Sequence, residues 1–253
     1  MTIDDALNHV SVVLVDTVQP GNIGSAARAM SNMGLSRLKL VNPRGVLSSE
    51  CLKMAGKAVD IVTGAAVFKS LDEALGNENL VVGTTSSRDR AARQRIYSPR
   101  AIAPVILKHA ASGRVALVFG SEKRGLTDDQ LALCQYLVTV PAHPGHPVLN
   151  LAQAVMVLAY EIYSCQEPDP SPHQVLATQQ MREEMFGHLE KTLLRIGFLS
   201  SSNPGHIMKS IRRFLGKAEL TPRDIQIIRG ILSQVEWFAE EGHKLEAEKV
   251  RKP

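Results

Sequence analysis

Four glycine-containing segments of the chain carry polar side chains at short spacing, and each follows a run of apolar residues. They span residues 19–28, 83–88, 119–126 and 140–155. Open α/β sheets bind ligands in the crevice beyond the carboxyl ends of their strands. We therefore expect these four segments to gather around one ligand site.

The first segment holds two candidate side chains. Asn22 can cap a helix, and helical spacing places Arg28 one turn beyond Gly24. Arg28 is either a ligand-binding cation or a solvated surface cation, and its type alone leaves both open. The segment lacks a full G-x-G-x-x-G pattern, which argues against an ordinary dinucleotide site.

The next two segments offer hydroxyls and a carboxylate. Thr84, Thr85 and Ser86 follow an apolar strand, where they could bind a small molecule or simply form a polar turn. Glu122 lies between Gly120 and Gly125, and it either takes part in the chemistry or ties the loop through backbone N–H groups.

The fourth segment is an irregular loop with three prolines and a glycine, followed by a helix of small and apolar residues. Asn150 stands at the expected start of that helix, where capping is its simplest role. His143 and His146 suggest a metal site, but no third ligand is apparent, so we expect polar contacts and no metal.

These segments must be positioned by an α/β sheet whose strands are covered on both faces, because the apolar runs are nearly continuous. The expected strands are Val10–Val15, Leu38–Val41, Leu80–Gly83, Val115–Phe119 and Tyr136–Val140, with a further short one at Val59–Val62. The expected helices between them are Gly24–Met33, Ala66–Leu75, Pro99–Ala111 and Asp128–Cys134, the first closed by Gly34.

A proline-rich stretch then interrupts the pattern, and helical periodicity alone follows it. We expect an α/β domain over 1–165, a stiff linker over 166–175 and a helical domain over 176–253. Its expected helices are Met181–Ile196, His206–Leu215 and Pro222–Glu240, the last capped by Thr221 with Asp224, and the tail from Lys244 should fray.

Composition sets broad limits. An apolar content of 44% over 253 residues supports a substantial core without disulfides or metals. Three scattered cysteines without a C-x-x-C pair indicate free thiols in a reducing compartment. Neither a signal peptide nor an apolar stretch of membrane-spanning length is visible, so we expect a cytoplasmic protein. The net charge of +4 is compatible with a nucleic-acid partner but does not establish one.

Three ordered motifs resemble those of the SpoU/TrmH RNA 2′-O-methyltransferases. They are Asn22-x-Gly24-x-x-x-Arg28, then Phe119-Gly120-x-Glu122-x-x-Gly125-Leu126, then Leu149-Asn150-Leu151-Ala152-x-Ala154-Val155. Pieces of the C-terminal part, such as Pro204-Gly205-x-x-Met208 and 228–232, resemble a tRNA-modifying bacterial branch of that family.

The resemblance implies a SPOUT fold, in which a parallel-sheet domain ends in a deep trefoil knot, and a homodimer whose active sites use both subunits. It also implies S-adenosyl-L-methionine as cofactor. The implied cofactor contacts are Thr84, Thr85, Ser86, Gly120, Val140, Pro147, Val148 and Leu149. The residues implied at the reacting ribose are Asn22, Arg28, Glu122 and Asn150.

The implied substrate is tRNA, methylated on a cytidine or uridine ribose at position 32 of the anticodon loop, with no DNA or membrane partner. Lys209, Arg212, Arg213 and Lys217 recur at intervals suited to a basic helical face, which joins Arg28 as the expected RNA-binding set. A merely solvated face is the alternative. Methylation of ribosomal RNA and a non-catalytic RNA-binding protein of the same fold are the competing functions.

The chain departs from the family pattern at one loop. Val148 stands where relatives usually have serine, and His146 stands where an aromatic residue is common. If that hydroxyl positions substrate or cofactor, Ser25, Ser121 or backbone groups must replace it here.

Overall fold

A computed structural model describes residues 2–86, 96–165, 175–200 and 204–250. The chain divides into two units, residues 1–179 and 180–253. The proline-rich segment 166–174, predicted as the larger part of a linker, lies outside the described residues.

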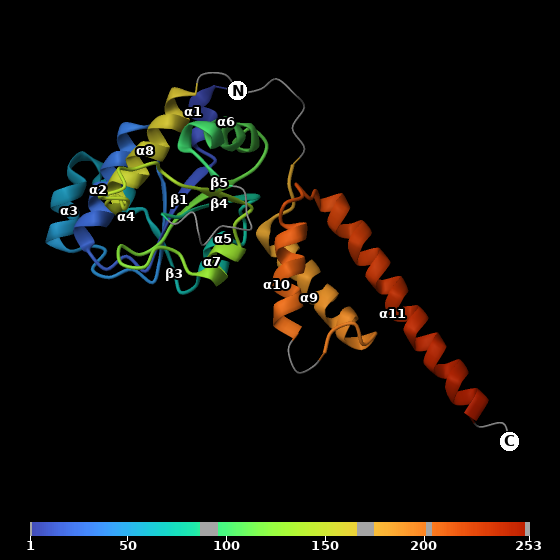
Figure 1. The fold of residues 1–253 in the computed structure, drawn as a ribbon. Coiled ribbons are helices and arrows are strands. Elements are labelled where there is room, and N and C mark those ends of the chain that lie inside the picture. The colour runs from blue at the N-terminus through green and yellow to red at the C-terminus, as the bar shows by residue number, and fades with distance from the viewer. Residues whose placement is uncertain (1, 87–95, 166–174, 201–203, 251–253) are drawn as a thin grey trace. The chain divides into compact units, whose positions relative to one another are not determined.

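The first unit is built on a parallel sheet with the strand order β3-β2-β1-β6-β4-β7-β5 (Figure 1). Its strands are β1 Val10–Val15, β2 Arg37–Val41, β3 Ala66–Phe68, β4 Leu80–Thr84, β5 Ile96–Tyr97, β6 Val115–Phe119 and β7 Tyr136–Val138. Its helices are α1 Ile3–Leu7, α2 Pro20–Asn32, α3 Ser49–Ala55, α4 Val59–Thr63, α5 Leu71–Leu75, α6 Pro99–Ala110, α7 Asp128–Ala132 and α8 Leu151–Ser164.

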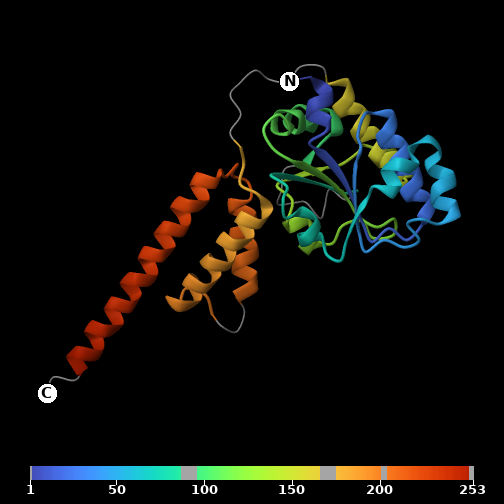
Figure 2. The same ribbon diagram turned by 180° about the vertical axis from the view of Figure 1, so that it is seen from behind.

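Helices cover both faces of this sheet, as the apolar strands predicted (Figures 1 and 2). Along β1, Val12 and Leu14 pack in a core shared with α1, α2, α3, α4, α6 and α8, whereas Val13 and Val15 pack against α5 and α7. Every residue of β1 and β6 is buried because successive side chains enter opposite cores.

Five of the predicted strands are confirmed, and their ends agree within two residues. The trefoil knot stays a prediction. The strand predicted at Val59–Val62 is wrong, because these residues form α4. Val59 and Val62, one helical turn apart, both pack against the core below α2, and this packing outweighs the preference of valine for strands.

Two helix predictions also need correction. Residues 66–75 are not one helix, since β3 pairs with β2 and α5 begins only after Ser70, whose hydroxyl accepts from Glu73 N–H. Asn22 does not cap its helix, because α2 already begins at Pro20 with Gln19 in the cap position. Gly34, with φ of 71°, follows the helix in the left-handed conformation as predicted.

The described residues of the second unit form α9 Gln179–Arg195, which begins at the unit boundary, α10 Pro204–Leu215 and α11 Pro222–Val250. The Thr221 cap of α11 is confirmed: Thr221 Oγ1 accepts from Asp224 N–H at 3.2 Å, and Asp224 Oδ2 accepts from Thr221 N–H at 2.8 Å. The helix runs to Val250, past both its predicted end at Glu240 and the predicted fraying at Lys244.

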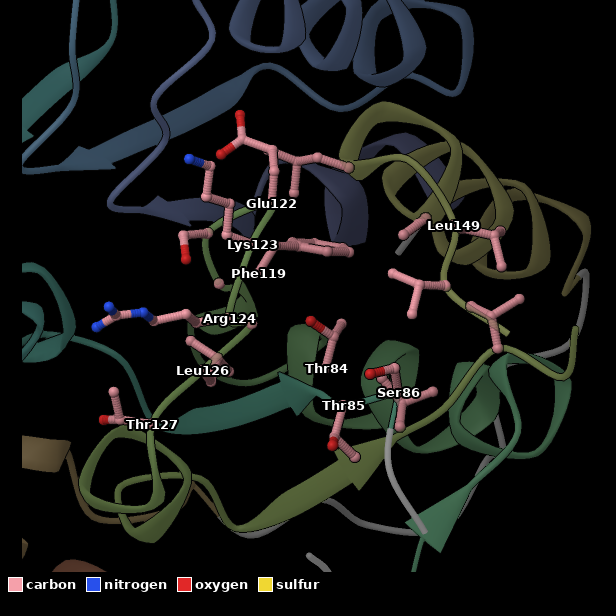
Figure 3. A pocket seen from close by; sticks show the side chains of 18 of the residues that line it. Thr84, Thr85, Ser86, Phe119, Glu122, Lys123, Arg124, Leu126, Thr127 and Leu149 are labelled. Atoms are coloured by element: carbon pink, nitrogen blue, oxygen red, sulfur yellow. The ribbon is translucent and has the colours of Figure 1, made fainter. Parts of the chain in front are cut away.

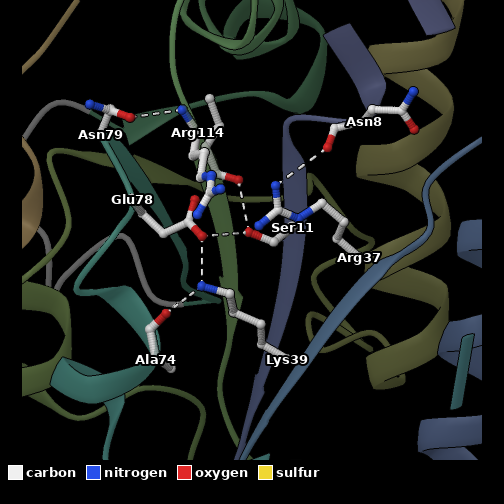
Figure 4. A network of polar contacts seen from close by, with 9 residues as sticks. Asn8, Ser11, Arg37, Lys39, Ala74, Glu78, Asn79 and Arg114 are labelled. Atoms are coloured by element: carbon white, nitrogen blue, oxygen red, sulfur yellow. Dashed lines mark hydrogen bonds and ion pairs between the residues drawn. The ribbon is translucent and has the colours of Figure 1, made fainter. Parts of the chain in front are cut away.

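A buried ion pair lies at the amino end of the sheet (Figure 4). Lys39 Nζ is 2.6 Å from Glu78 Oε1, and it also donates to the carbonyl of Ala74. Ser11 Oγ donates to the same Glu78 oxygen at 3.1 Å, while Glu78 Oε2 has no hydrogen-bond partner among the described residues. Since Glu78 is fully buried, Lys39 is the group that neutralises it.

The segment just before the second unit is held beside this ion pair. Asn79 Nδ2 donates to the carbonyl of Leu176 at 2.6 Å, and Gln179 N–H donates to the carbonyl of Glu78 at 2.9 Å. Leu176 and Ala177 are buried. Residues 176–179 therefore complete the first unit, although they follow the proline-rich segment.

Replacing Lys39 by methionine should lower the free energy of unfolding of the first unit by about 3–5 kcal/mol, because it leaves a buried carboxylate without its cation. Lys53→Met, at an exposed lysine on α3, should change it by less than about 0.5 kcal/mol. Adding Glu78→Leu to Lys39→Met should recover much of the loss. Urea denaturation followed by circular dichroism measures all three, and equal stability of the two lysine variants would contradict the assignment.

Candidate active site

A cavity of about 700 Å³ opens at the carboxyl ends of β4, β6 and β7 (Figure 3). All eight residues expected to contact a cofactor line it: Thr84, Thr85, Ser86, Gly120, Val140, Pro147, Val148 and Leu149. Phe119, Gly125, Leu126, Leu151 and Ala154 of the three motifs and Ser121 also line it. The sequence assigned no role to the remaining wall residues, Lys123, Arg124, Thr127, Asp128 and Val138, and their places within or beside the motifs were the available signal.

The strand register brings these loops together. β4 lies between β6 and β7, so its carboxyl end is flanked by both of theirs. Thr84 Oγ1 donates to the carbonyl of Val118 at 3.0 Å, and Thr85 N–H donates to the carbonyl of Val138 at 3.0 Å. The Thr139 hydroxyl donates to the Thr85 carbonyl. The threonine hydroxyls thus fasten neighbouring strands at the cavity floor.

The loop after β6 closes on itself. Gly125 N–H donates to the carbonyl of Ser121 at 2.8 Å, and Gly125 has φ of 64°. A Cβ on Gly120 would lie only 2.0 Å from the carbonyl carbon of Gly125. Both glycines are required by the loop's own path, which turns Glu122 toward the segment after β1.

The Glu122 carboxylate accepts three hydrogen bonds from that segment. Oε1 accepts from Asn22 Nδ2 at 2.8 Å and from Gln19 N–H at 3.2 Å, and Oε2 accepts from Val18 N–H at 3.2 Å. Partial burial raises the pKa of Glu122, but the hydrogen bonds from Asn22 and the backbone outweigh it and leave the pKa below its usual value. The carboxylate is therefore ionised at neutral pH and acts as an acceptor.

Asn22 also connects to the third motif. Its Oδ1 accepts from Asn150 Nδ2 at 2.9 Å, and Asn150 Oδ1 accepts from Ala152 N–H at 2.9 Å. Asn150 caps α8, as expected from its place in the sequence, and Gln153 completes the capping box. Glu122, Asn22 and Asn150 thus form one chain of hydrogen bonds that joins all three motifs.

Gly24 serves helix packing. A Cβ at this position would lie 2.1 Å from the carbonyl oxygen of Cys51, so only glycine lets α2 approach α3 this closely. Close packing of two helices, rather than contact with a ligand, explains the glycine of the first motif.

Arg28 lies apart from this network. It is exposed on α2 and is not among the residues that line the cavity. The structure of one chain therefore brings Asn22, Glu122 and Asn150 together but leaves Arg28 outside.

The loop at 141–148 is exposed, and Val148 has 63% of its surface accessible while lining the cavity. His143 Nδ1 accepts from Gly145 N–H at 3.1 Å. In the part of the chain that the structure describes, no group of three or more His, Cys, Asp or Glu side chains is arranged to hold a metal.

The basic residues of α10 differ in their surroundings. Arg212 Nη1 is 2.7 Å from Glu183 on α9, and its guanidinium lies 4.5 Å from the centre of the Phe186 ring. Lys209 and Lys217 are exposed and Arg213 is half-exposed. Arg212 is thus engaged in packing α10 on α9, whereas Lys209 and Arg213 lie elsewhere on α10 and Lys217 lies beyond its last residue, Leu215.

Helices α9 and α11 are linked by polar contacts along their length. Thr192 Oγ1 donates to Glu236 at 2.6 Å, and Arg195 Nη2 is 2.5 Å from Glu240. These contacts stabilise the packing of α9 and α11 within the second unit.

None of the helices in the described residues is long and apolar enough to cross a membrane.

Comparison with known proteins gives consistent matches over both units. Residues 9–160 match the SpoU rRNA methylase family, and residues 179–249 match the C-terminal domain of the tRNA methyltransferase TrmJ. The chain is 40% identical over 247 residues to the tRNA (cytidine/uridine/adenosine-2′-O-)-methyltransferase TrmJ of Pseudomonas aeruginosa, a match that covers 92% of this chain and 96% of the relative.

Two further relatives agree. The tRNA (cytidine/uridine-2′-O-)-methyltransferase TrmJ of Salmonella choleraesuis is 40% identical, with 91% of this chain and 97% of the relative covered. The crystal structure of TrmJ from Z. mobilis superposes with a TM-score of 0.78 at 35% identity, covering 89% of this chain and 98% of that one. The chain belongs to the TrmJ group of the SpoU methylase family.

Proposed function

We propose that this protein transfers the methyl group of S-adenosyl-L-methionine to the 2′-hydroxyl of a ribose in tRNA. The observation that carries the proposal is that all eight expected cofactor contacts line one and the same cavity, with Glu122 in its wall. The names of the relatives, which are tRNA 2′-O-methyltransferases, support the choice of reaction and substrate.

The cavity suits this cofactor in size and chemistry. Its volume of about 700 Å³ falls in the range of small-molecule sites. Apolar side chains, including Val138, Val140 and Leu149, can cover an adenine ring, and backbone groups of the loops at 84–86 and 120–125 can hydrogen-bond its polar edges. When bound, S-adenosyl-L-methionine supplies a methyl group on a positively charged sulfur, which a hydroxyl oxygen can attack.

The protein's contribution is chiefly positioning. Holding the ribose hydroxyl in line with the methyl group can supply much of the acceleration. The Glu122 carboxylate accepts hydrogen bonds from Asn22, Val18 and Gln19, so we propose that its role is to order the loop. Asn150 links that network to α8. Because Val148 has no hydroxyl, any contact that a hydroxyl makes at this position in relatives must come here from Ser121 or from backbone groups.

We assign Arg28 to the RNA. Arginine remains protonated in proteins, so literal removal of the hydroxyl proton by Arg28 is chemically unfavourable. Its planar guanidinium is suited to clamp a phosphate next to the target ribose and to stabilise the developing alkoxide. The proton then leaves to solvent or to a phosphate oxygen.

We further propose that the protein is a homodimer in which Arg28 serves the cavity of the partner subunit. The support is its place: Arg28 is exposed on α2 and lies outside the cavity of its own chain. In a two-fold dimer every contact occurs twice, so if one Arg28 reaches the cavity of its partner, the other does the same.

The second unit is assigned to tRNA binding, and the first to cofactor binding and catalysis. Lys209 and Arg213 on α10 and Lys217 just beyond it are suited to phosphates, whereas Arg212 is bound to Glu183. Within tRNA we propose a cytidine or uridine at position 32 of the anticodon loop as the target. We propose a cytoplasmic location, which a tRNA substrate supports.

Incubation of the purified protein with tritiated S-adenosyl-L-methionine tests the proposal directly. Unmodified tRNA should become labelled, and nuclease digestion with mass spectrometry should locate one 2′-O-methylated nucleotide. Labelling of ribosomal RNA in place of tRNA would support the competing substrate, and no labelling of either RNA would support a non-catalytic RNA-binding protein.

Arg28→Ala should lower kcat about 100-fold, the usual cost of losing one group that stabilises transition-state charge. Arg28→Lys should restore little of the rate, because an ammonium cannot form the two parallel hydrogen bonds of a guanidinium. Steady-state methyl transfer to tRNA measures both. Near-normal turnover by Arg28→Lys would rule out the clamp.

Mixing subunits tests the shared site. Arg28→Ala and Glu122→Gln chains, co-expressed with different tags, should regain about a quarter of wild-type activity, because half of the dimers are mixed and each has one intact site. The assay is run at a cofactor concentration below saturation, where both parents are impaired. If Arg28 serves its own cavity, the mixture will be no more active than the mean of its two impaired parents.

Truncation after Gln179 should leave cofactor binding intact, because the chain then retains the buried segment 176–179. Its affinity for tRNA should fall about tenfold or more, with a shallower dependence on salt. Calorimetry with the cofactor is the control, and filter binding at several salt concentrations is the measurement. Unchanged tRNA affinity would make the second unit a brace for the dimer instead.

A further inference from the structure

Helix α10 carries an aromatic side chain that its own unit does not bury. Phe214 is 73% exposed, whereas Met208 on the opposite side of the same helix is 4% exposed and packs inward. Ile207, two turns before Phe214, is 37% exposed and lies on the same side. Phe214 therefore adds little to the core of the second unit, and packing within this unit does not explain why a phenylalanine stands at this position.

The surroundings of Phe214 are strongly basic. Residues 204–217 contain four lysines and arginines and no acidic residue. Arg213 directly precedes Phe214 on α10. Lys217 is exposed in the turn that follows the helix, and its N–H donates to the carbonyl of Phe214 at 3.4 Å, so both cations lie close to Phe214. The one arginine of the helix that faces inward, Arg212, is already neutralised by Glu183.

A second exposed phenylalanine in the same unit provides a contrast. Phe238 on α11 is 74% exposed and contacts Trp237 edge-on at 6.2 Å between ring centres. Its neighbours in the sequence are Glu236, Glu240 and Glu241, and residues 230–241 contain no lysine or arginine. The two rings are equally accessible, but only Phe214 lies in a positive field.

We propose that Phe214, with Arg213 and Lys217, binds an unpaired nucleotide of RNA: the ring stacks on the base and the two cations contact the flanking phosphates. A flat aromatic surface between cations is complementary to a partner that is both polyanionic and flat-faced. Unpaired RNA loops present such bases, whereas a paired A-form helix hides them in its stack. The inference rests on the proposed tRNA substrate and assigns a loop-binding contact to the second unit.

The experiment compares full-length wild-type protein with Phe214→Ala, Phe214→Trp and the matched control Phe238→Ala. Dissociation constants are measured for an unmodified tRNA, for its isolated stem-loops and for a fully paired RNA duplex, each at several salt concentrations. Stacking of one base contributes enough that Phe214→Ala should weaken binding of the loop-containing RNAs about tenfold. Phe214→Trp should bind them at least as tightly as wild type, and Phe238→Ala should stay within about twofold of wild type.

Two readouts separate stacking from other roles. Phe214→Ala should leave the salt dependence of tRNA binding unchanged because it removes no charge, whereas Arg213→Ala or Lys217→Ala should each reduce the salt slope by about one. Phe214→Ala should also leave duplex affinity unaltered.

Three results would overturn the inference: equal effects of Phe214→Ala and Phe238→Ala, an equal loss for duplex and loop RNA, or a change of oligomeric state in Phe214→Ala seen by light scattering. The last would identify a second copy of the chain as the occupant of this surface.

Methylation of tRNA by the wild-type protein is measured in the same preparations. If wild type methylates tRNA while Phe214→Ala binds normally, only the stacking contact fails. If wild type methylates no tRNA, the proposed function fails.

Discussion

The carboxylate of Glu122 joins segments that lie far apart in the chain, and the candidate site depends on this junction. It accepts from the backbone N–H groups of Val18 and Gln19 and from the side chain of Asn22, which in turn accepts from Asn150. A negative charge is also favoured at the amino end of α2, because the helix dipole is positive there. The loop after β6, the start of α2 and the start of α8 are thereby fixed together.

The rest of the cavity follows from this constraint and from the sheet. Parallel pairing places the ends of β4, β6 and β7 side by side, and the threonine contacts at 84 and 139 fasten them. The loop at 120–125 needs Gly120 and Gly125 to close beneath Glu122. A cofactor in this cavity would therefore contact mostly backbone and small side chains, whose positions depend on the junction.

Much of this arrangement could be predicted from the sequence. Continuous apolar runs identified five strands, and three of the four polar segments after them line one cavity, because parallel strands end at one edge of the sheet. The segment at 19–28 does not line the cavity and is joined to it through the contact of Asn22 with Glu122. Val59–Val62 was mispredicted because valine spacing there fits a buried helix as well as a strand, and β5, with two residues, is too short to show a pattern. The contact of Asn22 with both Glu122 and Asn150 joins residues about 100 or more positions apart, which local spacing cannot reveal.

The local sequence pattern also could not predict that Arg28 lies outside the cavity or which side chains of α10 are exposed. Sequence spacing grouped Arg212 with Lys209, Arg213 and Lys217, but Arg212 faces Glu183 and Phe186 because residues one apart on a helix point about 100° away from each other. The same rotation leaves Phe214 outside. Side-chain direction in the second unit thus depends on which face of α10 packs against α9.

The cofactor affinity of Glu122→Gln tests the central claim most directly. A glutamine would direct an N–H group at N–H groups from which the carboxylate now accepts hydrogen bonds. We therefore predict that calorimetry will show at least about tenfold weaker binding of S-adenosyl-L-methionine. Circular dichroism should show an intact fold. Because the pKa of Glu122 is lowered, its charge and the contacts that depend on it should persist at neutral pH and be lost only as the pH falls through that lowered pKa. Wild-type affinity in Glu122→Gln would contradict the account.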